Sequence, residues 1–191
     1  MLYIINTIES RYVEYTKTYN QLIKLGVDKS KIIIDYGYTK KDKICKKKYH
    51  LIHFNFLERV LPMVIEKHED LVYLEDSVKP MAKVEDIDID AAKINWLGYL
   101  FNTKSFICGV KMVYIPYDIC VDIYAKRNDF RPQYIDRLIR NYGIKNDCLK
   151  IDENYIMLYP QTTSAWGTDT QMKRKEGAKS KLYVDSDIES V

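Results

Sequence analysis

Within the first 35 residues, two short apolar runs flank one amphipathic stretch, and this order limits the possible folds more than any other feature of the chain. Leu2–Ile5 is a continuous apolar run, which is typical of a buried strand. Residues 9–25 repeat tyrosine, leucine and isoleucine at helical spacing, which predicts a helix that ends at Gly26. Ile32–Ile34 is β-branched and predicts a second strand. The pattern therefore predicts a βαβ unit, in which the two strands run parallel.

Further apolar patterns continue this arrangement toward the C-terminus. Helical spacing runs from Ile52 to Ile65, and Pro62 is expected to kink or split that helix. Leu71–Leu74 predicts a third strand. Four more segments are expected: strands over residues 94–101, 109–115 and 155–159, and a helix around residues 134–142, with an acidic surface loop over residues 84–90. The chain is thus expected to be α/β, a Rossmann-like sandwich around a mixed, mostly parallel central sheet.

The length and composition are those of one globular domain. The 191 residues are 47% hydrophobic and 13% aromatic, which is enough to fill a core. One domain is expected over residues 1–172, followed by a charged, flexible tail over residues 173–191. Lys and Arg number 30 and Asp and Glu number 27, and the resulting net charge of +3 does not require a large surface of one sign.

The cysteines and the apolar runs exclude several classes of protein. The four cysteines form no C-x-x-C pair, which argues against a zinc knuckle and against a disulfide framework. No apolar run approaches the ~18 residues of a membrane span, and the N-terminus lacks the basic region of a signal peptide. A reduced cytoplasmic protein is expected. The many Lys, Ile, Tyr and Asn residues hint at an AT-rich, viral genome, in which case the location is the host cytoplasm.

Polar side chains follow each of the three early strands. Asn6 and Thr7 follow the first strand, Asp35 follows the second, and Glu75 and Asp76 follow the third. Ligands of open α/β sheets bind beyond the carboxyl ends of the strands, so these residues are expected to lie near a ligand. Adjacent carboxylates repel each other, and a cation such as Mg²⁺ or Mn²⁺ between them and a diphosphate would relieve the repulsion.

These residues alone leave a simpler alternative open. The same segment is also typical of a solvated strand end that turns over residues 77–80.

Four segments in this order carry a resemblance to a known family. They are Ile4–Thr7 with Arg11 soon after, Ile33–Gly37, Leu74–Val78, and Tyr159–Asp169. Together they resemble nucleotide-sugar glycosyltransferases of the GT-A fold, most of all the small lipooligosaccharide-type and procollagen galactosyltransferase-like group. Leu74-Glu75-Asp76-Ser77 is similar to that group's "LEDD" form of the DxD metal motif. The resemblance spans roughly residues 2–170. It implies a GT-A-like fold and transfer of a sugar from a UDP- or GDP-linked donor to a hydroxyl group.

The resemblance also implies a role for each residue of the site. The donor would be bound by Asn6, Thr7, Arg11, Asp35, Glu75 and Asp76. Of these, Glu75 and Asp76 would hold Mn²⁺ or Mg²⁺. Ser77 stands where the group usually has a third acid, and serine is a poorer ligand, so the other two would have to carry any metal. Replacing Asp76 by alanine is expected to abolish transfer and leave the fold intact.

An inverting transfer needs a carboxylate that deprotonates the acceptor hydroxyl. Asp136 is the first candidate, and its alternative role is an exposed acid paired with Arg140 one helical turn away. Asp169 is the second candidate. A retaining transfer needs no such base, and the sequence leaves the stereochemistry open.

Other residues are candidates for contacts with the substrates. Trp96 is expected to form a floor for the acceptor by stacking, with core packing as the alternative. Gly109 would let the acceptor approach the backbone, or would simply permit a tight bend. Asn55, on the helix after the second strand, is a candidate for contact with the donor.

Two basic segments suggest one class of acceptor. Lys40–Lys48 and Lys173–Lys181, with the 17 tyrosines, are suited to hold a phosphate backbone and to stack on an extruded base. A hydroxymethylated base in viral DNA is therefore one acceptor. The alternatives are a glycan or lipid-linked acceptor with both segments as solvated loops, and a non-catalytic nucleotide- or DNA-binding module. The oligomeric state is not determined by the sequence.

Overall fold

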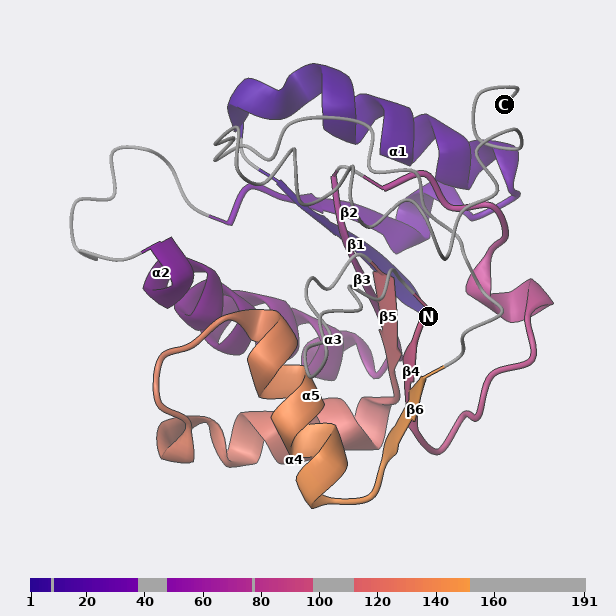
Figure 1. Cartoon of the computed structure of the whole chain (residues 1–191). Coiled ribbons are helices and arrows are strands. Elements are labelled where there is room, and N and C mark those ends of the chain that lie inside the picture. The colour runs from indigo at the N-terminus through magenta and orange to yellow at the C-terminus, as the bar shows by residue number, and fades with distance from the viewer. Residues whose placement is uncertain (8, 38–47, 77, 98–111, 152–191) are drawn as a thin grey trace, which may run out of the picture.

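Within the described residues, the fold is built on a six-stranded sheet with strand order β2-β1-β3-β5-β4-β6 (Figure 1). The computed structural model describes residues 1–7, 9–37, 48–76, 78–97 and 112–151. The strands are β1 (Leu2–Asn6), β2 (Ile32–Asp35), β3 (Leu71–Glu75), β4 (Ile94–Trp96), β5 (Met112–Ile115) and β6 (Leu149–Ile151). β1 is parallel to β2 and β3, and β4 is parallel to β6, whereas β5 is antiparallel to both of its neighbours. The predicted mixed, mostly parallel sheet is confirmed.

The predicted βαβ unit is confirmed at the N-terminus. β1 and β2 pair in parallel, and the connection between them begins as the short 3₁₀ turn η1 (Glu9–Arg11) and continues as α1 (Tyr12–Lys24). Gly26 ends the helix with a φ of 86°, a left-handed conformation that glycine adopts at little cost. Its N–H donates to the carbonyl of Ile23 at 2.9 Å, which satisfies one of the carbonyls at the end of the helix.

The helical segment between β2 and β3 is interrupted next to Pro62, as expected. α2 (Lys48–Asn55) passes into the π-helical turn η3 (Phe56–Val60) and then into α3 (Leu61–Lys67). The N–H of Leu61 donates to the carbonyl of Phe56, five residues back. A proline lacks an N–H and its ring collides with the carbonyl four residues earlier, so a wider turn before Pro62 removes that conflict.

The second half of the described chain differs from prediction in three places. It contains the 3₁₀ turns η4 (Val84–Asp86) and η5 (Arg127–Asp129) and the helices α4 (Tyr117–Ala125) and α5 (Ile135–Lys145). α5 was expected, whereas α4 and β6 were not. The acidic segment predicted as a surface loop begins with the short turn η4 and its Val84 is fully buried, whereas Glu85, Asp86 and Asp88 are exposed as predicted. Residues 98–111 and the predicted strand at 155–159 lie outside the described residues, as does the predicted tail.

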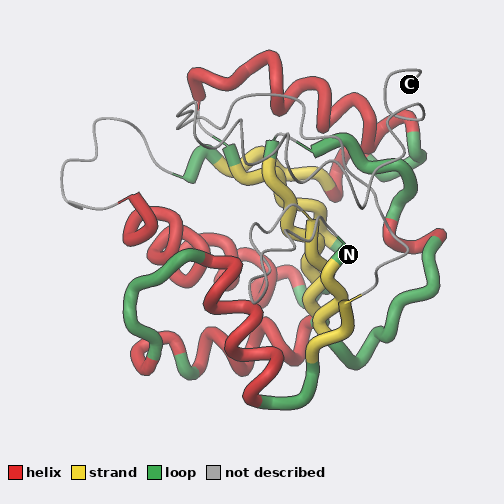
Figure 2. Tube along the Cα trace, viewed as in Figure 1, coloured by secondary structure: helices red, strands yellow, loops and turns green. Residues whose placement is uncertain are grey.

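Helices cover both faces of the sheet. α1 lies on one face, and α2, α3, α4 and α5 lie on the other (Figures 1 and 2). Because side chains alternate along a strand, Ile5 and Leu74 pack on the α1 side while Ile4 and Tyr73 pack on the other side. None of the helices in the described ranges is long and apolar enough to cross a membrane.

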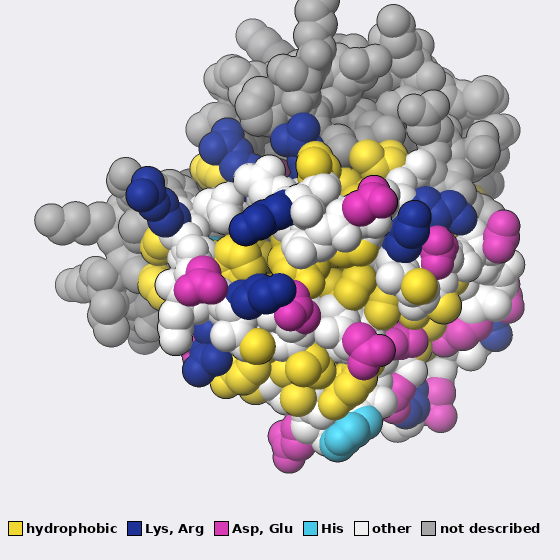
Figure 3. Space-filling view, turned by 90° about the horizontal axis from the view of Figure 1, so that it is seen from below, with side chains coloured by type: hydrophobic (Ala, Val, Ile, Leu, Met, Phe, Trp, Pro, Cys, Tyr) yellow, Lys and Arg dark blue, Asp and Glu magenta, His cyan; other side chains and the backbone are white. Residues whose placement is uncertain are grey.

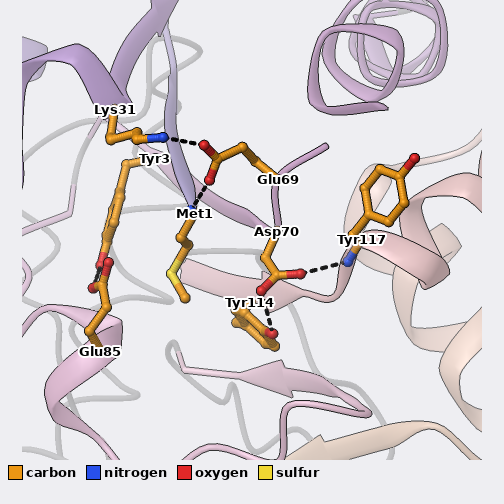
Figure 4. Close-up of polar contacts among 8 residues, drawn as sticks. All are labelled: Met1, Tyr3, Lys31, Glu69, Asp70, Glu85, Tyr114 and Tyr117. Atoms are coloured by element: carbon orange, nitrogen blue, oxygen red, sulfur yellow. Dashed lines mark hydrogen bonds and ion pairs between the residues drawn. The ribbon is translucent and has the colours of Figure 1, made fainter. Parts of the chain in front are cut away.

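The amino ends of the strands carry a paired polar network, drawn in Figure 4. The Asp70 carboxylate accepts a hydrogen bond from the Tyr114 hydroxyl at 3.0 Å and another from the Tyr117 N–H at 2.8 Å. Glu69 next to it accepts from the ammonium of Lys31. This hydrogen bond lowers the pKa of Glu69 below its ordinary value. We call this region the amino edge, and its two carboxylates, Glu69 and Asp70, are paired within the protein.

Candidate functional site

The ends of three strands meet at the opposite edge of the sheet, which we call the carboxyl edge. Asn6 lies in register with Asp35 on one side and with Glu75 on the other. The sequence predicted that these polar positions would fall at one edge, and the structure brings them together there. Neighbouring strands lie about 4.8 Å apart, so the three side chains can meet one ligand.

The pleat of the sheet divides the polar residues into two groups. Residues in register share a face, so Asn6, Asp35 and Glu75 lie on the side of α2–α5. Thr7 and Asp76 come one position later in the chain and contact each other on the α1 side. The six residues predicted to bind one donor are therefore divided between opposite faces of the sheet.

The first group, the Asp35 cluster, consists of Asn6, Asp35, Gly37, Asn55 and Arg59. The Asp35 carboxylate is 2% exposed and accepts a hydrogen bond from the Asn55 side-chain amide. Its other oxygen lies 3.3 Å from a guanidinium nitrogen of Arg59, whose side chain is 58% exposed. Burial raises the pKa of Asp35, and the contacts with Asn55 and Arg59 act in the opposite direction. Among the described residues, the charge of Asp35 is thus balanced by a cation at the surface.

Two amide oxygens in the Asp35 cluster lack partners. Asn55 donates its NH₂ group to a carboxylate, so its Oδ1 must face elsewhere as an acceptor. Among the described residues, this oxygen and Oδ1 of Asn6 are buried without a hydrogen-bond partner. Leaving a buried acceptor unpaired costs free energy, and such exceptions in a native structure call for an explanation. Both oxygens suit a ligand that brings N–H or O–H donors.

Gly37 lets the chain pass close to these amides after β2. A Cβ at this position would lie 2.7 Å from Nδ2 of Asn55 and 3.0 Å from Oδ1 of Asn6. Real Cβ atoms do not approach that closely, so a larger residue would displace the amides. The turn after β2 and the first helix on this face are therefore fitted to each other.

The second group, the Asp76 cluster, consists of Thr7, Arg11, Thr18 and Asp76. Asp76 is 8% exposed and Arg11 is 7% exposed. One oxygen of Asp76 accepts from Nε of Arg11 at 2.7 Å and from the Thr7 hydroxyl at 2.5 Å. Burial raises the pKa of Asp76, and the hydrogen bonds from Arg11 and Thr7 oppose that rise. The charge of Asp76 is balanced inside the protein.

Backbone contacts fix the Asp76 cluster to its surroundings. The N–H of Asp76 donates to the carbonyl of Asn6 at 3.2 Å. The Thr18 hydroxyl of α1 lies 3.0 Å from the Asp76 carbonyl and 2.6 Å from the Val78 carbonyl, and these two oxygens share its single O–H donor. The end of β3 is therefore joined both to β1 and to α1.

Three tyrosines form an aromatic surface on the α1 side of this edge. The Tyr36 hydroxyl donates to the Tyr15 hydroxyl at 2.9 Å, and their rings meet edge to face with centroids 5.6 Å apart. Tyr12 packs edge to face against Tyr15 in the same way. Tyr12 and Tyr36 are exposed, so a flat ring can stack on this surface.

The described residues fit a shared divalent cation poorly. Nowhere in the described ranges do three or more His, Cys, Asp or Glu side chains come together in a group that could hold a metal ion. Glu75 and Asp76 belong to opposite faces of the sheet, and Asp76 already has Arg11 as its counter-charge. Ser77 lies outside the described residues. In this arrangement the two carboxylates do not form one cation site.

The remaining predicted site residues fall in different environments. Asp136 is half-buried in the first turn of α5, on the same side of the sheet as the Asp35 cluster. Trp96 is completely buried in the core on that side, so its ring packs as a core residue and offers no exposed face for stacking. Asp169 and Gly109 lie outside the described residues, as do the basic segments except for Lys48 at the start of α2.

Arg59 was not predicted from the sequence, and Gly37 entered the prediction only as the end of the segment Ile33–Gly37. Arg59 follows Asn55 by four residues within one helical segment, the spacing that places two side chains on the same face. That spacing was the available signal. What the sequence lacked was the position of this helix over Asp35, since the two segments are brought together only by the fold.

Comparison with known proteins gives the fold a context. No protein-family model matches the sequence, and no curated protein sequence matches it either. A solved structure that does resemble it is a glycosyltransferase involved in the glycosylation of the major capsid of PBCV-1. That structure has a TM-score of 0.58 and 9% identity, over 93% of this chain and 98% of the other. A second is the glycosyltransferase GlyE of Streptococcus pneumoniae TIGR4, with a TM-score of 0.44 and 10% identity, over 80% of this chain and 45% of the other.

The first of these likenesses shows the fold. Together with the mixed sheet and its helices on both faces, it confirms the predicted GT-A-like α/β architecture. The roles of individual residues are a separate question, because a likeness at this level of identity is a likeness of backbones.

Proposed function

We propose that this chain is a glycosyltransferase that moves a sugar from a nucleotide-diphosphate sugar to a hydroxyl acceptor. One observation carries the proposal: in a GT-A-like fold, the carboxyl edge holds a buried carboxylate and two buried amide oxygens that have no partner among the described residues. Ligands of open α/β sheets bind at this edge. An edge whose acceptors are unpaired is suited to a ligand rich in donors.

A nucleoside supplies such donors. Its ribose hydroxyls and its ring N–H groups can donate to the Asp35 carboxylate and to Oδ1 of Asn6 and of Asn55. Arg59 adds a positive charge at the exposed rim of the same cluster, where it would offset part of the charge of the diphosphate. UDP- and GDP-linked sugars both meet these requirements.

Transfer itself needs a group that accepts a proton if the reaction inverts the sugar. Asp136 is our first candidate, since it lies in the first turn of α5 on the side of the Asp35 cluster. Its carboxylate would take the proton of the acceptor hydroxyl. The acceptor oxygen then bonds to the anomeric carbon as the bond from that carbon to the phosphate oxygen breaks, and the nucleoside diphosphate leaves. Asp169 remains the second candidate.

The test is a binding and turnover screen with UDP- and GDP-sugars. We expect one nucleotide class to raise the melting temperature and to be hydrolysed or transferred with release of UDP or GDP. Asp35→Asn is expected to weaken donor binding by about 10- to 100-fold, because a carboxylate acceptor is lost from a buried contact. Asp70→Asn is the matched control: it changes a paired aspartate at the amino edge and should leave the dissociation constant unchanged.

The screen is run with Mn²⁺, with Mg²⁺ and with a chelator. If no nucleotide sugar shifts the melting temperature under any of these conditions, the proposal is wrong. Binding without release of free nucleotide or transfer would instead favour a non-catalytic nucleotide-binding module.

The acceptor is a further part of the proposal. A hydroxymethylated base in DNA is our first candidate, supported by the two basic segments of the sequence. The face drawn in Figure 3 mixes Lys and Arg with Asp and Glu, so that face is not a surface of one sign. Binding to duplex DNA should weaken steeply with salt if lysines contact phosphates. A flat response, or no binding at low salt, would favour a glycan or lipid-linked acceptor.

A further inference from the structure

We propose that Arg11 serves as the counter-charge of Asp76 in place of a divalent cation, so that Asp76 positions the strand ends and is not a metal ligand. The proposal departs from the role that the DxD-like motif implies for Asp76. It rests on the proposed function only where a nucleotide is used as a probe, because the contact between Arg11 and Asp76 is a property of the protein alone.

The charge balance at Asp76 is the first argument. Arg11 and Asp76 are each more than nine-tenths buried, at 7% and 8% exposure. The guanidinium lies 2.7 Å from the carboxylate, so the negative charge is already neutralised. A divalent cation bound to the same carboxylate would lie within a few ångströms of the buried guanidinium, and in a medium of low dielectric constant that repulsion is large.

The surroundings of the carboxylate are the second argument. Mg²⁺ and Mn²⁺ in nucleotide enzymes usually keep several waters and bind one or two carboxylates together with phosphates. Asp76 is buried, and the oxygen that contacts Arg11 also accepts from Thr7. Glu75 belongs to the other face of the sheet, in register with Asn6. A cation at Asp76 would therefore have little room for its waters.

The chain segments that contact Asp76 indicate a structural role for it in place of metal binding. Arg11 ends η1 directly before α1, and Thr7 directly follows β1. Both donate to Asp76, which directly follows β3. The N–H of Asp76 also donates to the carbonyl of Asn6, whose side chain belongs to the Asp35 cluster. Asp76 therefore holds the end of β3 and the connection from β1 to α1 in a fixed relation, and is a positioning residue.

The first experiment measures melting temperatures of the full chain without any nucleotide. Asp76→Asn and Arg11→Met should each lower the melting temperature by roughly 10 °C, because each leaves a buried charge without its partner. The double variant should lose less than the sum of the two single losses, since neither charge remains. Asp118→Asn, at an exposed position of α4, is the control and should shift it by less than about 3 °C.

Two results of that experiment would overturn the proposal. An unchanged melting temperature in Asp76→Asn would show that the pair does not hold the structure, and strictly additive losses would show that the two residues are not coupled. If Asp76→Asn does not fold, Thr7→Val takes its place: it removes one donor to Asp76 and no charge, and should lower the melting temperature by about 2–4 °C.

The second experiment measures Mn²⁺ binding by electron paramagnetic resonance, with and without UDP or GDP. Wild type and Asp76→Asn should bind Mn²⁺ with the same affinity, or neither should bind it, at a temperature where both are folded. A loss of affinity of tenfold or more in Asp76→Asn, with Asp118→Asn unaffected, would identify Asp76 as a metal ligand and overturn the proposal. Neither experiment requires transfer. A failure of the nucleotide-sugar screen therefore leaves these results interpretable.

Discussion

Two buried aspartates stand at the same edge of the sheet and have opposite surroundings. Asp76 meets a guanidinium that is itself buried, and its carboxylate also accepts a hydrogen bond from Thr7 inside the protein. Asp35 meets a guanidinium at the surface, next to two amide oxygens that have no partner among the described residues. The charge of Asp76 is balanced inside the protein, whereas the charge of Asp35 is balanced by a cation at the surface, beside two unpaired amide oxygens.

The difference shows which of the two is equipped for binding. Burial of an aspartate does not by itself identify a binding site, because burial raises the pKa of both Asp35 and Asp76. A ligand gains free energy only where it supplies contacts that the protein lacks. We therefore propose the Asp35 cluster as the binding region, and the Asp76 cluster as the group that keeps the strand ends in register.

The largest expected effect is a difference in the free energy of unfolding between a variant of the Asp76 cluster and a variant of the Asp35 cluster. Asp76→Ala should lower the free energy of unfolding by about 3–5 kcal/mol, because it leaves the Arg11 charge buried and unpaired. Asp35→Ala should cost less, about 1–3 kcal/mol, since Arg59 can be solvated and only the Asn55 amide loses its partner. Urea denaturation of both variants measures the difference.

This prediction replaces an expectation drawn from the sequence, namely that Asp76→Ala would leave the fold intact. Burial of the pair gives the reason for the change. Equal losses of unfolding free energy in the two variants would contradict the distinction between a cluster whose charge is balanced inside the protein and one whose charge is balanced at the surface.

The next effect tests how closely the Asp35 cluster is packed. Gly37→Ala should lower the free energy of unfolding by about 1–3 kcal/mol, because the new Cβ would lie 2.7 Å from Nδ2 of Asn55. The cost should shrink when Gly37→Ala is made in an Asn55→Ala background, which removes the nearest atom. Chemical denaturation of the four proteins in this cycle gives the coupling. A cost that is the same in both backgrounds would contradict the proposed contact.

The sequence was sufficient for the parallel half of the sheet. Leu2–Ile5 and Ile32–Ile34 are strongly apolar and flank a regular helical pattern, so local signals agreed with the fold. The segments that escaped prediction carry weaker signals. β6 (Leu149–Ile151) has only three residues, none of them fully buried, and α4 (Tyr117–Ala125) is short. In neither is the pattern long enough to identify the element.

The position of the candidate site could be predicted from the sequence, but the contacts between its residues could not. That Asn6, Asp35 and Glu75 meet at one edge follows from parallel strands of known order. That Arg11 pairs with Asp76, 65 residues away, depends on how α1 packs on the sheet. Local patterns do not specify such long-range contacts, so one predicted site became two clusters.

The next prediction concerns a smaller change in stability and compares substitutions of Arg59 and Arg11. Arg59→Met should change the free energy of unfolding by about 0–1 kcal/mol, because an exposed ion pair contributes little to stability. Arg11→Met, measured beside it, should cost several times more. The pair of variants keeps the substitution constant and changes only the burial of the cation. Similar costs for both arginines would remove the distinction between the clusters.

The smallest expected effect is on the pH dependence of stability, and it compares an acid of the carboxyl edge, Asp35, with an acid of the amino edge, Glu69. Burial raises the pKa of Asp35, so in the folded state this acid holds its proton to a higher pH than in the unfolded chain. The stability it contributes is fully present below about pH 4 and is lost as the pH rises through the folded-state pKa. The Lys31 hydrogen bond lowers the pKa of Glu69, so its contribution is present above about pH 4.5 and is lost as the pH falls.

The two acids therefore give opposite slopes. Between pH 4 and pH 7, roughly the range over which ordinary carboxyl groups finish ionising, the stability of wild type minus that of Asp35→Asn should decrease as the pH rises. The difference between wild type and Glu69→Gln should increase over the same range. Urea denaturation at several pH values measures both slopes. A slope of the same sign for both variants would mean that Asp35 is held ionised by Arg59 despite its burial, and the charge of Asp35 would then be balanced as well as the charge of Asp76.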